Sequence, residues 1–142
     1  MTLSMRLCAA VGLFLALDLS GAPAEAAGTK VNGEIGLELA LKVNPAIPDG
    51  TPVSISATVA ASDSVYSNSS LLYLSGTVRG GIFKTTTTIY YAWTVASKHD
   101  NLSINLSISG GKGSYSATAS LYKTIPLPAN GAVTKVIFDD AL

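Results

Sequence analysis

Apolar and polar residues alternate along most of the chain, and the alternation is densest in residues 85–95. One set of alternate positions there is Ile89, Tyr91, Trp93 and Val95, and the other set is mostly threonine. Successive side chains of a strand point to opposite faces, so the first set is predicted to face a core. β-Branched and aromatic residues favour strands, and a run of threonines stiff at χ1 is unfavourable in a helix. We predict that this stretch is the central strand of a small β-sandwich.

Six further stretches have the same two-residue period. They are residues 31–43, 53–61, 71–78, 102–109, 114–122 and 132–138. Residues 62–70 are predicted to be a loop, because Ser, Asp and Asn dominate them. The pair Gly80-Gly81 predicts a hairpin turn before the threonine-rich strand. Since residues 82–95 are long for one strand, we expect a bend or bulge near Lys84 or Thr85.

Seven such strands without a convincing helix predict an all-β fold. Their number and spacing favour a small immunoglobulin-like or fibronectin-like β-sandwich of about seven antiparallel strands. We expect one domain that covers residues 28–142. Fold analogy of this kind says nothing about function.

The first 27 residues have the pattern of a cleavable signal peptide. A short segment with one positive charge, Arg6, precedes an apolar run at residues 7–19 and a small-residue segment at residues 22–27. We expect cleavage after Ala27, with Ala24 as the alternative. The run is too short to span a membrane comfortably and contains Asp18, so no integral membrane span is expected after cleavage. The protein is therefore predicted to be secreted or periplasmic.

Composition narrows the class of protein further. Cys8, the only cysteine, lies in the predicted signal, so the exported domain has no thiol for a disulfide or a zinc site. Beyond residue 27, eight basic residues stand against seven acidic ones. This balance gives no electrostatic footprint for nucleic acid. The hydroxyl-rich surface and the alanine-rich signal favour a bacterial origin.

Residues for catalysis are scarce. His99 is the only histidine, and a Ser-His-Asp triad would need it as base with Asp100 or Asp63 as its partner. Its position in a Lys-His-Asp-Asn turn is more typical of a solvated loop. Scattered turn acids give no EF-hand pattern for calcium. We therefore predict no catalytic, cofactor-binding or metal-ligating residues, no cofactor, and a protein that is not an enzyme.

The aromatic residues leave two interpretations open. Trp93 either fills the core or joins Tyr90 and Tyr91 in a platform that stacks on a flat ligand, and strand alternation favours the core. The tyrosines predicted to be exposed are candidates for stacking on a sugar ring. They are Tyr66, Tyr73, Tyr90 and Tyr122.

Two functions follow from these observations. The first is a non-catalytic module with a structural or protein-interaction role, able to associate with itself or with a partner protein through edge strands, since few edge-protecting charges are visible. The alternative is a carbohydrate-binding module that holds a polysaccharide with the exposed tyrosines. The sequence names neither the partner nor the strand order.

Overall fold

The computed structural model describes residues 28–141, and in these residues every regular element is a β-strand. The strands are β1 (Thr29–Lys42), β2 (Pro52–Ser62), β3 (Ser67–Thr77), β4 (Ile82–Val95), β5 (Asn101–Lys112), β6 (Tyr115–Pro126) and β7 (Ala132–Phe138). The predicted all-β class and the seven strands are confirmed. The predicted signal peptide lies outside the described residues. The described part of the chain contains no helix long and apolar enough to cross a membrane.

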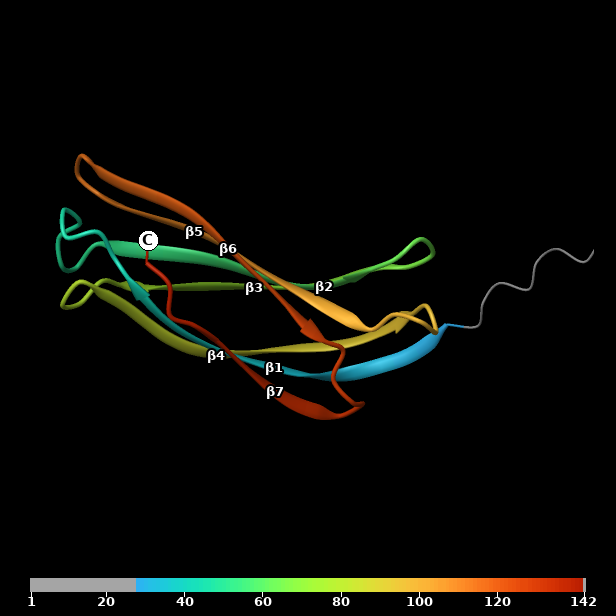
Figure 1. The fold of residues 1–142 in the computed structure, drawn as a ribbon. Helices are drawn as coiled ribbons and strands as arrows, with labels where there is room; N and C mark the ends of the chain where they lie inside the picture. Colours follow the sequence, from blue (N-terminus) through green and yellow to red (C-terminus); the bar gives the residue numbers. More distant parts are fainter. Residues whose placement is uncertain (1–27, 142) are drawn as a thin grey trace, which may run out of the picture.

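The strands form two sheets that face one another as a sandwich (Figure 1). One sheet has three strands in the order β4-β1-β7, and the other has four in the order β3-β2-β5-β6. Every pairing is antiparallel except that of β1 with β7, which is parallel. The immunoglobulin-like or fibronectin-like type is not confirmed. In immunoglobulin domains the first two strands share a sheet, whereas here β1 and β2 lie in different sheets.

The threonine-rich strand β4 lies at an edge of its sheet, so its predicted central position is wrong. The central strand is β1, which β4 and β7 flank. β-Branched and aromatic residues favour any pleated, half-buried strand and do not specify how many neighbours it has. The predicted bulge is also absent from the pairing with β1, because the register runs without interruption from Thr29 opposite Val95 to Lys42 opposite Ile82.

The predicted inward set of β4 is confirmed. Ile89, Tyr91 and Val95 are buried, and Trp93 is half-buried against the core. The Trp93 and Tyr91 rings lie 5.1 Å apart at a tilt of 40°. Trp93 thus packs at the margin of the core and is no flat exposed platform.

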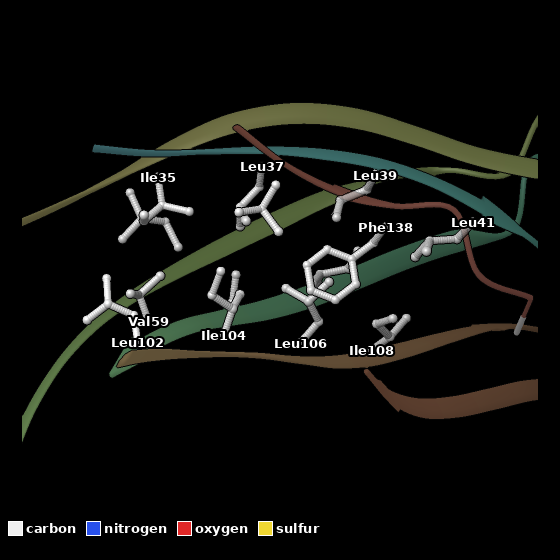
Figure 2. Packing of buried hydrophobic residues seen from close by; sticks show 14 of the residues in the cluster. Ile35, Leu37, Leu39, Leu41, Val59, Leu102, Ile104, Leu106, Ile108 and Phe138 are labelled. Atoms are coloured by element: carbon white, nitrogen blue, oxygen red, sulfur yellow. The ribbon is translucent and has the colours of Figure 1, made fainter. Parts of the chain in front are cut away.

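The core lies between the two sheets. Side chains of β1 point toward those of β2 and β5, with Phe138 of β7 among them, as Figure 2 shows. The labelled residues are Ile35, Leu37, Leu39, Leu41, Val59, Leu102, Ile104, Leu106, Ile108 and Phe138. All of them are buried. Residues 28–141 contain no cysteine, so no disulfide links the two sheets. The main stabilising contact between the sheets is therefore the packing of these apolar faces.

Part of the predicted loop at residues 62–70 is strand. Residues from Ser67 onward pair with β2, beginning with Ser67 opposite Ser62. Their side chains are exposed or half-buried, so Ser and Asn are tolerated at these positions, which are not part of the core. The turn that remains is short, and the N–H of Asp63 donates to the Tyr66 carbonyl at 2.9 Å.

The predicted turn at Gly80-Gly81 is confirmed, and both glycines adopt positive φ, at 59° and 71°. A carboxylate from another loop holds the turn. Asp49 accepts hydrogen bonds from the Gly80 and Gly81 N–H groups, at 2.9 and 3.2 Å. These bonds hold the pKa of the Asp49 carboxyl below its usual value. The loop before β2 is thereby fixed to the β3–β4 turn.

Candidate functional site

The outer edge of β3 has a row of backbone groups that no strand of the described residues pairs with. Its eleven residues contain no charged residue and no proline, and all of them pair with β2 in one uninterrupted register. Such an edge lacks the charges, prolines and bulges with which sheet proteins block further pairing. Among residues 28–141, β2 is the only strand whose backbone pairs with β3, and the Asn68 side-chain amide donates a hydrogen bond to the Thr94 carbonyl of β4 at 2.8 Å.

The hydrogen bonds at the two ends of the β2–β3 ladder show which residues of β3 have free backbone groups. Asp63 N–H bonds to the Tyr66 carbonyl, and Val78 N–H bonds to the Thr51 carbonyl. Bonded and non-bonded pairs alternate along an antiparallel ladder. Even-numbered residues of β3 therefore bond to β2, and odd-numbered ones, such as Leu71 and Tyr73, direct N–H and C=O away from it.

Strand β6 is the opposite edge of the same sheet, and the same reasoning applies to it. The N–H of Leu127 donates to the Asp100 carbonyl at 2.8 Å, directly beyond the last pair of the β5–β6 ladder. Odd-numbered residues of β6 therefore bond to β5, and even-numbered ones, such as Ser120 and Tyr122, have free backbone groups.

The only charged residue of β6, Lys123, is turned toward the other sheet. Its ammonium donates to the Ile137 carbonyl of β7 and lies 4.7 Å from the centre of the Phe138 ring. An inward charge is one of the devices that discourage further pairing at an edge. Lys123 lies near the end of the strand, so residues 115–122 remain free of charge.

Small and mostly polar side chains cover the outer face of the two inner strands of this sheet, β2 and β5. The outward residues of β2 and β5 are Ser54, Ser56, Thr58, Ala60, Ser103, Asn105, Ser107 and Ser109. The large exposed side chains of this face lie instead on the two edge strands. They are Leu71, Tyr73 and Tyr122, with exposed fractions of 52%, 74% and 65%. Apolar surface is thus concentrated where backbone groups are also unpaired.

The structure brings together two of the four tyrosines that the sequence suggested as sugar-stacking residues. Tyr73 and Tyr122 share the outer face of the four-stranded sheet, one at each edge. Tyr90 is exposed on β4, in the other sheet. Tyr66 is half-buried in the turn between β2 and β3. No platform that combines all four exists.

A small apolar cavity lies on the inner side near β6, and sequence reasoning missed it. It has a volume of about 40 Å³, and its lining includes Val53, Ile108, Gly110, Ala117 and Ala119. Ligand pockets for small molecules measure roughly 300 to 1,000 Å³, so this cavity is no such pocket. Small residues at three inward positions of β5 and β6 are the sequence signal that could have indicated it.

The candidate catalytic pair is part of a loop clamp. Asp63 accepts hydrogen bonds from the N–H groups of Tyr66, Val65 and Ala96, at 2.7, 2.8 and 3.1 Å. These three bonds, in that order, and the nearby His99 hold the pKa of the Asp63 carboxyl below its usual value. His99 Nδ1 lies 3.7 Å from Asp63 Oδ2. Through these contacts the Asp63 carboxylate joins the β2–β3 turn to the β4–β5 loop, which is a structural role.

No group of three or more His, Cys, Asp or Glu side chains able to hold a metal ion occurs within the described range. Glu34 and Glu38 lie on the outward side of β1, and Glu38 forms an ion pair with Lys135. The geometry thus defines a two-sheet all-β sandwich whose most open features are the edges of its four-stranded sheet. Comparison with models of known families, with curated proteins and with solved structures found no match.

Proposed function

We propose that the protein is a non-catalytic module with a structural or protein-interaction role, and that it acts by accepting a further β-strand at an edge of its four-stranded sheet. The observation that carries this proposal is β3, an eleven-residue edge strand without charge, proline or bulge. In such recognition the main chain supplies affinity, and alternate side chains supply specificity.

The exposed side chains of the edges support the same proposal. Leu71 and Tyr73 place apolar surface beside the free backbone groups of β3. Aromatic and aliphatic side chains next to one another across strands stabilise pairing by about 0.2 to 1 kcal/mol each. A strand added at β3 gains both the hydrogen bonds and these contacts.

A matched pair of lysine substitutions tests the proposal. Leu71→Lys places a charge on the β3 edge, whereas Asn105→Lys places the same charge in the same row of the same face, on the inner strand β5. We expect sedimentation equilibrium to show concentration-dependent association of the wild type and of Asn105→Lys. Leu71→Lys should associate at least tenfold more weakly, because it removes the apolar contact of Leu71 with the new strand and places on the edge a charge of the kind that blocks pairing. A wild-type protein that stays monomeric at high concentration contradicts the proposal.

A carbohydrate-binding module is the second candidate, and the placement of Tyr73 and Tyr122 on one uncharged face favours it. Sugar rings stack on aromatic faces, and the serine and threonine rows between the two rings could bond to sugar hydroxyls.

Affinity electrophoresis against a panel of neutral polysaccharides tests this second candidate. The wild type and Tyr90→Ala, which alters the other sheet, should be retarded by the bound polymer, and the double variant Tyr73→Ala with Tyr122→Ala should not be. Equal mobility of all three proteins on every polymer would remove this candidate.

A further inference from the structure

We propose that the strand which pairs with β6 is β3 of a second copy of this chain, so that copies join head to tail into an open filament. This inference rests on the proposed function and names its partner. Four observations carry it: the directions of the two edge strands, their free backbone groups, the side chains beside those groups, and the room left by the other sheet.

Strand directions permit the contact. Strand β2 is antiparallel to β3 and to β5, and β5 is antiparallel to β6, so β3 and β6 run in opposite directions. A copy displaced across the sheet therefore presents its β3 antiparallel to β6. This continues the alternation of the four-stranded sheet without reversing any strand.

The free backbone groups of the two edges also match. Odd-numbered residues of β3 and even-numbered residues of β6 carry both the free groups and the side chains of the outer face. Pairing them therefore joins outer face to outer face and inner face to inner face. If the rows of the sheet continue, Tyr122 lies opposite Leu71 of the next copy, and Ser120 lies opposite Tyr73. Five such pairs would make about ten hydrogen bonds, as many as a typical stable interface has.

Side chains fit this register on both faces. On the outer face, Tyr122 would lie beside Leu71 of the next copy, so that the large exposed groups of the two edges cover one another. On the inner face, half-buried Leu72 and Leu74 of the next copy would lie beside Leu121 and Ala119.

The inner-face contacts also cover the open features of β6. Ala119 lines the apolar cavity, which Leu74 of the next copy would cover. Lys123 would lie directly opposite Ser70, a small polar residue. A contact between two β3 strands would leave this cavity and the whole edge of β6 uncovered.

The other sheet is narrower than the repeat of this contact, and its edge strand β4 lies beside β3, where the Asn68 side-chain amide donates to the Thr94 carbonyl. Strands in a sheet lie about 4.8 Å apart, so four strands repeat at roughly 19 Å, whereas the three-stranded sheet spans roughly 14 Å. The narrower sheet of each copy therefore fits within the repeat. Adjacent strands twist by about 20 to 25°, so each copy is rotated relative to the last, and a contact that does not close gives a helical filament.

Two proline variants separate head-to-tail pairing from the alternatives. Tyr73→Pro removes a free N–H from β3, and Ser120→Pro removes one from β6, so neither substitution breaks a hydrogen bond inside the sheet. We expect each variant to be monomeric alone in sedimentation velocity. An equal mixture should form a 1:1 dimer and nothing larger, because each variant keeps the edge that the other lacks. The wild type should form filaments, with a repeat near 19 Å by electron microscopy.

Other outcomes overturn the inference in distinguishable ways. If Ser120→Pro alone forms dimers, the contact joins two β3 strands; if Tyr73→Pro alone does, it joins two β6 strands. If both variants associate like the wild type, neither edge is the contact. If one variant alone forms dimers, the head-to-tail arrangement is wrong, but the proposed function of pairing at a sheet edge still holds. A wild-type protein that is monomeric contradicts both the head-to-tail arrangement and the proposed function. Circular dichroism checks that each variant folds. If proline prevents folding, the single variants Tyr73→Lys and Ser120→Lys replace the two proline variants.

Discussion

At the scale of single residues, the close approach of two strands depends on Gly33. This residue of β1 lies opposite Tyr91 of β4. A Cβ atom there would come within 2.7 Å of the Tyr91 hydroxyl oxygen and 2.9 Å of the Ala132 carbonyl oxygen. The Tyr91 hydroxyl is buried without a hydrogen-bond partner among residues 28–141, and burial raises its pKa. Tyr91 thus occupies space that only a glycine leaves open.

Gly33→Ala should therefore lower the free energy of unfolding by about 1 to 3 kcal/mol, the usual cost of overpacking. The control is Gly36→Ala on the same strand, where the nearest atom to a new Cβ is the Thr134 carbonyl oxygen at 3.9 Å. That variant should stay within about 0.5 kcal/mol of the wild type. Urea unfolding followed by tryptophan emission measures both. Equal stability of the two variants would show that Tyr91 moves aside without cost.

Asp63 should make stability depend on pH. Its folded-state pKa is lowered from 3.8 by three backbone hydrogen bonds, so its contribution is present at neutral pH. The contribution should be lost as the pH falls through 3.8 and then through the lower folded-state value. Asp63→Asn should melt at a lower temperature than the wild type at pH 7, and the difference should shrink at acid pH. A difference that is constant from pH 7 to pH 2.5 would contradict the role of the charge.

At the scale of the strands, two-residue alternation predicted which side of each strand is buried. Ile35, Leu37, Leu39 and Leu41 are buried on β1, as their alternation indicated. Composition was a poorer guide to secondary structure at positions outside the core. Ser67 to Ser70 form part of a strand, although their polar composition predicted a loop. Alternation describes one strand at a time, so it could not show that β4 is an edge and β1 the centre.

The candidate site was accessible to sequence reasoning only in part. Alternation placed Tyr122 on the outward side of its strand, and Tyr73 was expected to be exposed; both side chains are exposed in the structure. That they share a sheet while Tyr90 belongs to the other follows from strand order, which pairs residues far apart in the chain. The sparsity of edge charges was visible in the sequence, but which strands are edges was not.

At the scale of the whole molecule, the open features lie on one sheet. The four-stranded sheet has two long edge strands, β3 and β6. Their only charged residue is Lys123 of β6, which is turned toward the other sheet. In the three-stranded sheet, β7 has only seven residues and Lys135 among them, and β4 includes Lys84. Lysine and short strands are common means of protecting an edge. This asymmetry is why both proposals above concern the four-stranded sheet.

The parallel pairing of β1 with β7 has a consequence for how the chain folds. Strand β1 lies between β4 and β7 only when β7 is present, because β7 pairs with β1 from Ala132 opposite Gly33 onward. Contacts that span almost the whole domain make closure slow, because loop-closure entropy is lost before the contacts form. Until β7 has been synthesised, one side of β1 has no strand to pair with, and the core beside it lacks Phe138. The nascent chain therefore has its longest exposure to aggregation at the strand that ends up most protected.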